Sequence, residues 1–192
     1  MSNVTQLYGG AITTVIPGGF LDASLIREVP DTQEVFVNSR KEDEKTIFND
    51  GLGYNESAIV DLLQIVDDVP TDKDALNVHI KEIASLNQSD ELHIAKYETL
   101  SETIQSCICV EDAYKWGKRS EKETVAVCTA LIRLKDVETD VVLTINVPVT
   151  SEQPEELAVL EKGELPERVL AAYKLVKTMA TEFKIIDKSL FV

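Results

Sequence analysis

The stretch LYGGAITTVIPGGFLDASLIREVPDTQEVFVN, residues 7–38, decides how the N-terminal part of the chain folds. Apolar and polar residues alternate at residues 11–16 and again at residues 34–38, which predicts two half-buried strands. Between them, the sequence PGG at residues 17–19 predicts a tight turn. The first strand is therefore expected to end in a turn, and the second follows after a longer connection.

That connection is rich in charged and polar residues and closes with the turn-forming pair Pro30-Asp31. A rigid turn that presents several charges is suited to binding a partner protein. A solvated loop whose Asp and Pro residues only form turns explains the same composition. The polar residues of the connection are Asp22, Arg27, Glu28, Asp31, Gln33 and Glu34.

The chain has the composition of an ordinary globular protein, with 192 residues of which 44% are apolar and 28% charged. We therefore expect a single domain over residues 1–192, acting as a monomer. Its formal net charge of -15 opposes binding to nucleic acid or to an anionic membrane. Exposed acidic groups attract a basic protein partner, although solubility alone also explains the charge.

The N-terminal residues MSNVTQLYGG lack the positive charge and apolar run of a signal peptide. No segment approaches the roughly 18 apolar residues of a membrane span, so we expect neither secretion by that route nor membrane insertion. Cys107, Cys109 and Cys128 are odd in number and lie in apolar alternating segments. This pattern predicts reduced, buried thiols, as in the cytosol or nucleus.

Two helices are predicted in the middle of the chain. Residues 39–53 form a charged connection that we expect to be exposed. A helix is predicted from Asn55, because apolar residues recur at helical spacing as far as Val66. A second helix is predicted from Thr71, where Thr71-Asp72-Lys73-Asp74 fits a capping box.

The C-terminal half predicts a run of strands followed by a helix. The strands are expected at residues 92–97, 104–114, 123–135 and 139–149, with a hairpin turn at residues 116–120. Residues 149–164 are expected to be a polar connection, and a strongly amphipathic helix follows from Pro166 to Phe183. Together these elements predict an α+β fold, an antiparallel sheet with helices on both faces.

No recognisable set of catalytic residues is found. The sequence WGKRS at residues 116–120 lacks the glycine spacing of a phosphate-binding loop, and no G-x-S-x-G motif occurs. His79 and His93 have no metal-binding spacing and are interpreted as structural residues. We therefore expect no catalytic residue, metal or cofactor, and interpret the chain as a binding module.

Four blocks of the sequence resemble the Ran guanine-nucleotide release factors of the Mog family. They are residues 7–38, NESAIVDLL at residues 55–63, ALIRLKDVETDVVLTINVP at residues 130–148 and the terminal FKIIDKSLFV. The first block is specific, because DxSxxRxVPDxQEV at residues 22–35 is not a generic turn pattern. The resemblance covers most of the chain.

The resemblance implies an α/β/α sandwich similar to the PsbP-like fold. It also implies binding to the small GTPase Ran, alone or with a further Ran-binding protein, and release of the guanine nucleotide of Ran. Such proteins support nuclear protein import, reside in the nucleus with the cytoplasm as a second location, and are not hydrolases. Carried over by position, the Ran-binding surface comprises Asp22, Arg27, Asp31, Gln33, Glu34, Asn55, Glu56 and Asp61.

Each of these residues also has a local interpretation. Asp22 and Asp31 could stabilise turns, and Arg27 could form a surface ion pair. Gln33 could be a strand-edge residue. Asn55 could cap the predicted helix, Glu56 could interact with the helix dipole in its first turn, and Asp61 could lie on its solvent face.

The resemblance also suggests a mechanism of nucleotide release. Acidic groups of this chain could pair with basic groups near the switch regions of the GTPase or compete for its metal site, which favours the nucleotide-free state of the GTPase. The alternative function is that of an acidic adaptor for another basic protein, without release activity.

Overall fold

The computed structural model of the chain describes residues 2–89, 91–114 and 122–191. Its strands are β1 (Ser2–Leu7), β2 (Ile12–Pro17), β3 (Phe20–Asp22), β4 (Gln33–Asn38), β5 (Ser57–Gln64), β6 (Leu92–Thr99), β7 (Ile104–Tyr114), β8 (Lys122–Leu134), β9 (Thr139–Val149) and β10 (Lys184–Ile185). The α-helices are α1 (Lys45–Phe48), α2 (Asp72–Leu86), α3 (Pro154–Glu161) and α4 (Glu167–Thr181). Single 3₁₀ turns include η1 (Tyr8–Gly10), η2 (Ala23–Leu25), η3 (Glu42–Glu44), η5 (Lys135–Val137) and η6 (Lys188–Phe191).

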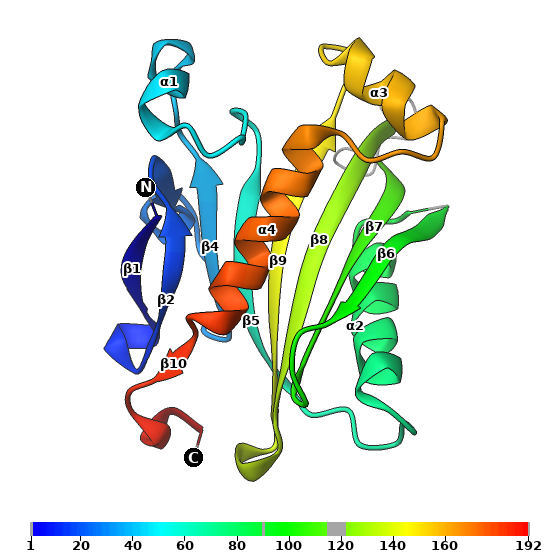
Figure 1. Cartoon of the computed structure of the whole chain (residues 1–192). Coiled ribbons are helices and arrows are strands. Elements are labelled where there is room, and N and C mark those ends of the chain that lie inside the picture. Colours follow the sequence, from blue (N-terminus) through cyan, green and yellow to red (C-terminus); the bar gives the residue numbers. More distant parts are fainter. Residues whose placement is uncertain (1, 90, 115–121, 192) are drawn as a thin grey trace.

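A seven-stranded sheet forms the centre of the molecule, in the order β3-β4-β5-β9-β8-β7-β6 (Figure 1). Each pair of neighbouring strands in it is antiparallel. The strands β1, β2 and β10 form a second, smaller antiparallel sheet. The predicted α+β class with an antiparallel sheet is thereby confirmed.

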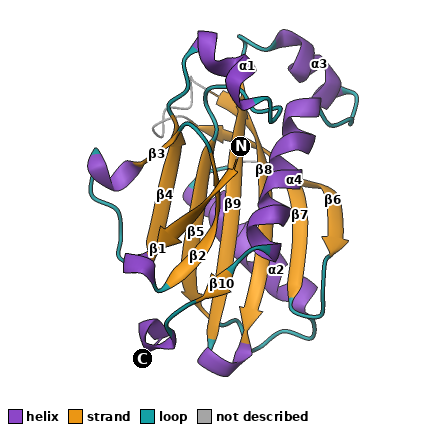
Figure 2. Ribbon diagram, turned by 60° about the vertical axis from the view of Figure 1, so that its left-hand side comes forward, coloured by secondary structure: helices purple, strands orange, loops and turns teal. Residues whose placement is uncertain are grey.

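The central sheet lies between helices. One face packs against α4 and the small sheet, where Ile12 of β2, Leu143 of β9 and Met179 of α4 share one core (Figures 1 and 2). The other face packs against α2, where Leu76 meets Cys107 of β7 in a separate core. Alternate residues of the central strands therefore enter different cores, as the period of two in an extended strand requires.

The helix predicted from Asn55 is wrong, because this segment forms strand β5. Val60 is fully buried in the core under α4, and the half-buried neighbour Ile59 points to the opposite face as a strand requires. The run SAIVDLL fits both a helical and an extended pattern, and local periodicity does not separate the two. Backbone pairing with β4 on one side and β9 on the other decides in favour of the strand.

Most other elements agree with the predictions. The bounds of β7 and β9 are the predicted ones, and the Thr71 hydroxyl caps α2 by accepting a hydrogen bond from the Asp74 N–H at 3.2 Å. The polar connection predicted at residues 149–164 contains the additional helix α3. The turn predicted at residues 116–120 lies outside the described residues.

Residues 39–53 were predicted to be an exposed connection, but Arg40 anchors them to the preceding turn. Its guanidinium donates to the Gly18 carbonyl at 2.9 and 2.8 Å and to the Asp50 carboxylate at 2.8 Å. It also lies over the Phe48 ring. Arg40 is only 7% exposed, so the prediction is wrong at this residue, whereas residues 41–43 and 49–51 are exposed as predicted. Burial favours a higher pKa for Asp50, but the Arg40 hydrogen bonds hold that pKa below its usual value.

The cysteines and His79 are buried inside the fold, and His93 lies on its surface. Cys107, Cys109 and Cys128 are free and buried, which confirms the prediction of reduced, buried thiols. His79 is buried on α2, with Nε2 2.8 Å from the Asp140 carboxylate. His93 is exposed on the edge strand β6.

Replacing Met179 by alanine is expected to lower the free energy of unfolding by about 2 to 5 kcal/mol, because the side chain is fully buried and leaves a cavity. The matched control is Leu170→Ala on the same helix, where the side chain is 41% exposed. Urea denaturation of the two variants measures the difference. Equal losses would contradict the burial of this face of α4.

Candidate partner-binding surface

The connection from β3 to β4 is held in a fixed shape. The Asp22 carboxylate accepts a hydrogen bond from the Ser24 N–H at 2.8 Å and so caps η2. The Ala23 carbonyl then accepts from the N–H groups of Ile26 and Arg27, at 2.9 and 3.0 Å. Ala23 itself is 2% exposed. A charged capping residue and a buried alanine therefore fix the backbone that carries the following exposed residues.

Tyr8 connects the small sheet to the beginning of β4. Its N–H donates to Glu34 Oε1 at 2.6 Å, and its hydroxyl donates to the Val60 carbonyl at 2.8 Å and lies 3.1 Å from the Thr32 carbonyl. Tyr8 has a φ of +50°, a conformation that non-glycine residues rarely adopt. Burial first, and then the nearby Asp61 and Glu34 carboxylates, raise the pKa of the Tyr8 hydroxyl, so it stays protonated and remains a donor.

Gln33 and Asp61 face each other across β4 and β5. Burial raises the pKa of the Asp61 carboxyl above its usual value, while a hydrogen bond from Gln33 acts in the opposite direction. Asp61 was expected on the solvent face of a helix, but it is half-buried on a strand. It lies at the same end of the β4–β5 ladder as Glu34 and Thr32.

Asn55 and Glu56 lie at the other end of this ladder, beside Arg168 of α4. Arg168 Nη1 donates to Glu56 at 2.9 Å and to Asn55 at 2.8 Å. Glu56 also accepts from the Gly53 N–H at 2.7 Å and from the Asn38 side chain at 2.8 Å. Asn55 is exposed, whereas Glu56 is 1% exposed. Our expectation that Glu56 lies on an exposed helix is therefore wrong.

Arg168 completes this buried network through a second carboxylate. Its Nη2 donates to Glu156 of α3 at 2.7 Å and to the Pro148 carbonyl at 2.8 Å. Burial works against the charged guanidinium, but the Glu156 and Glu56 hydrogen bonds outweigh it and raise the pKa of Arg168. The network joins the residues just before β5 to β9, α3 and α4, so its role is structural.

The predicted site residues thus divide into two groups. Asp31, Gln33, Glu34 and Asp61 gather where β4 begins, and the Asp22–Arg27 segment leads into that region. Glu56 precedes β5, and Asp61 lies five positions further along the extended chain, a span of about 17 Å. One surface at the beginning of β4 accommodates the first group but not Glu56.

Three residues of this region were not predicted from the sequence. Leu25, the last residue of the capped turn η2, is 74% exposed, and Ile26, which follows it, is 68% exposed. Two adjacent aliphatic residues inside a polar loop were a visible signal for them. Tyr8 had no such signal, because its hydroxyl bonds to a strand more than fifty residues away.

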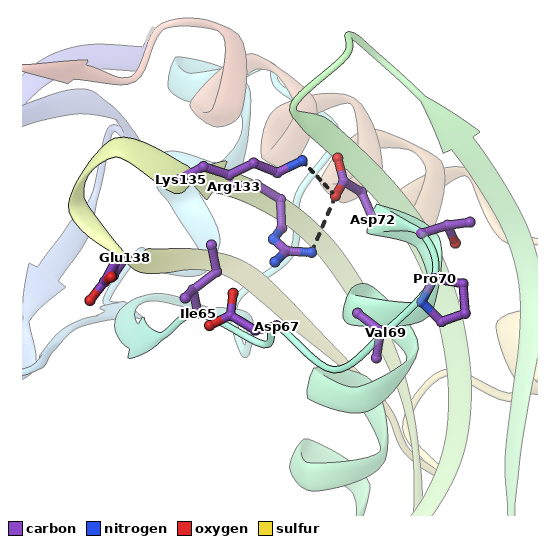
Figure 3. Close-up of a pocket in the computed structure, with 9 residues that line it drawn as sticks. Ile65, Asp67, Val69, Pro70, Asp72, Arg133, Lys135 and Glu138 are labelled. Carbon is purple, nitrogen blue, oxygen red and sulfur yellow. Dashed lines mark hydrogen bonds and ion pairs between the residues drawn. The ribbon is translucent and has the colours of Figure 1, made fainter.

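A separate cleft of 320 Å³ opens between the hairpin after β8 and the beginning of α2 (Figure 3). Its two cations are already paired, since Arg133 and Lys135 both contact Asp72, at 3.2 and 3.3 Å. Arg133 also reaches Asp140 at 2.7 Å. Asp67 and Glu138 also line the cleft, so its charges do not favour an anion.

Over the described ranges, no group of three or more His, Cys, Asp and Glu residues is placed to hold a metal ion. Of the helices in those ranges, none is both long and apolar enough to cross a membrane. The fold and its surface define a small α+β protein with a rigid loop of acidic and exposed apolar residues at one end of its sheet. These are features of a protein-binding module.

Comparison with known proteins identifies the family. Residues 5–148 match the family described as Ran-interacting Mog1 protein, and the chain belongs to the Mog1 family. It is 46% identical to the nuclear import protein MOG1 of Saccharomyces cerevisiae over 187 residues, which cover 97% of this chain and 83% of that protein. It is 30% identical to the Ran guanine nucleotide release factor of Danio rerio over 154 residues, covering 74% and 76% of the two chains.

The fold agrees with a solved structure of the family. The crystal structure of the Saccharomyces cerevisiae Ran-binding protein Mog1p is similar with a TM-score of 0.90 and 45% identity, covering 100% of this chain and 99% of that chain. The family resemblance found in the sequence and the α+β fold are thus both confirmed.

Replacing Glu56 by alanine is expected to lower the free energy of unfolding by about 3 to 5 kcal/mol, because it leaves Arg168 without its fully buried partner. Urea denaturation measures this loss, and Glu161→Ala, which removes an exposed carboxylate from the end of α3, is the control. A Glu56→Ala protein that is as stable as the parent would show that the network does not support the fold.

Proposed function

We propose that this protein binds the small GTPase Ran and promotes release of its guanine nucleotide, in support of nuclear protein import. Membership of the Mog1 family carries the proposal. Relatives are named nuclear import protein and Ran guanine nucleotide release factor. The whole chain acts as one monomeric Ran-binding unit, located in the nucleus and also in the cytoplasm.

The surface at the beginning of β4 is the proposed contact with Ran. Asp31 is exposed in the turn before β4, and Glu34 and Asp61 are half-buried beside it. In a chain of net charge -15, these carboxylates favour encounter with a basic region of the partner. Arg27 and Gln33 complete the polar part of the contact, whereas we assign Asn55 and Glu56 to the structural network around Arg168.

Release follows if the protein binds one state of Ran better than another. A GTPase holds its nucleotide through a lysine, backbone amides and Mg²⁺ at the phosphates. Carboxylates that pair with basic groups near that site bind more tightly when the nucleotide is absent. Such differential affinity shifts Ran towards the nucleotide-free state, whereas equal affinity for both states shifts nothing. The protein acts as a regulator without hydrolytic chemistry of its own.

The direct test is binding to Ran that carries GTP, carries GDP or has been stripped of nucleotide. We expect the tightest binding to stripped Ran, and accelerated loss of a fluorescent guanine nucleotide when the protein is added. Equal affinity for the three forms, with no acceleration, would contradict release activity and favour an adaptor role.

Replacing Asp31 by asparagine is expected to slow catalysed nucleotide release about threefold, because an exposed charge at an interface mainly affects the rate of association. The effect should shrink in high salt, where exposed charges are screened. Glu161→Gln, which removes one exposed charge from the end of α3, is the matched control. If both variants slow release equally, general acidity and not this turn is responsible.

Glu34 requires two variants because its carboxylate also supports Tyr8. Glu34→Gln removes the charge but keeps an oxygen for the Tyr8 N–H, whereas Glu34→Ala removes both. If the charge contacts Ran, release is slowed to a similar extent in both, as a stopped-flow release assay would show. Normal release by Glu34→Gln together with slow release by Glu34→Ala would restrict Glu34 to holding the Tyr8 turn.

A further inference from the structure

The exposed surface of the β3–β4 connection has an apolar centre. Leu25 is 74% exposed and Ile26 is 68% exposed. Leu21, just before the turn on edge strand β3, is 39% exposed. In the described ranges no other two large apolar neighbours in sequence are so exposed. Single exposed aliphatic residues are common, but adjacent ones indicate an interaction site.

Leu25 and Ile26 lie in a turn whose backbone is fixed by hydrogen bonds. The Asp22 carboxylate caps the turn at Ser24, and the Ala23 carbonyl receives two backbone N–H groups. Ala23 is buried beneath it. The two aliphatic side chains are therefore held outwards before any partner arrives, which reduces the entropy lost on binding.

The apolar pair is surrounded by charge. Arg27, Glu28 and Asp31 follow in the same connection and are exposed. Interfaces between proteins commonly place an apolar centre inside such a polar rim. Central apolar contacts mainly determine how long a complex lasts, while rim charges mainly determine how fast it forms.

We propose that Leu25 and Ile26 form the apolar centre of the contact with the GTPase, where they occupy a nonpolar depression on its surface. The inference rests on the proposed function and extends it. The occupant is the GTPase because the pair is continuous with the acidic turn at Asp31, which is assigned to that partner. Asp22 is a positioning residue that acts through the capped turn.

The test is the kinetics of binding to stripped Ran at physiological and high salt. Ile26→Ser is expected to raise the dissociation rate about tenfold or more, with an association rate close to that of the parent. The dissociation rate should rise by a similar factor at both salt concentrations. Asp31→Asn is expected to lower the association rate, with an effect that salt removes. Leu86→Ala, in which an 82% exposed side chain at the end of α2 is truncated, is the matched control.

The outcomes separate this inference from the proposed function. If Ile26→Ser dissociates as slowly as the parent while Asp31→Asn binds more slowly, the apolar centre is wrong and Ran binding stands. If the parent does not bind Ran in any nucleotide state, the proposed function itself fails. Sedimentation provides a third outcome. If the parent forms dimers and the Ile26→Ser variant is a monomer, the patch binds a second copy of this chain and the inference is overturned.

Two substitutions at Asp22 test its positioning role. Asp22→Asn keeps an oxygen that can accept from the Ser24 N–H, whereas Asp22→Ala does not. We expect the asparagine variant to dissociate from Ran at the parental rate, and the alanine variant to dissociate several-fold faster at both salt concentrations. Equal weakening by the two variants, removed by salt, would show that Asp22 acts by its charge and not by holding the turn.

Discussion

The position of β5 between β4 and β9 is the constraint on which the rest of the structure depends. On one side Gln33 pairs with Asp61, and on the other side Gln64 pairs with Thr139. Without β5, the short strands β3 and β4 would have no pairing with the other strands of the central sheet. The Val60 carbonyl of β5 also accepts a hydrogen bond from the hydroxyl of Tyr8, which lies between β1 and β2 of the small sheet. The proposed Ran-binding surface is therefore built at the C-terminal end of a strand that is paired on both sides.

The sequence correctly predicted the helices and strands whose local residue pattern agrees with their environment in the fold. The capping box at Thr71, the alternation in β7 and β9 and the amphipathic α4 all have this property. It failed at β5, because a run of apolar residues carries no information about which strands will pair with it. Arg40 is a similar case, since a charged residue in a polar connection gives no sign of the carbonyl and carboxylate that bury it.

Acidic residues in this chain serve two different purposes. Glu56 is fully buried and pairs with Arg168, so its charge supports the fold. Asp31 is exposed and free to meet a partner, while the Asp22 carboxylate caps a turn. Sequence alone placed all three on one surface because burial and hydrogen bonding depend on distant elements. The turn signals at residues 22–35 nevertheless located the segment on which the proposed surface is built.

Hydrogen exchange of backbone amides, with and without stripped Ran, tests the location of the contact most directly. A contact at the beginning of β4 predicts slower exchange in residues 21–34 and around η1 when Ran is bound. Exchange in α3, at the other end of the central sheet (Figure 1), should remain unchanged. Protection confined to α2, α3 or the edge strand β6, with no change in residues 21–34, would contradict the account.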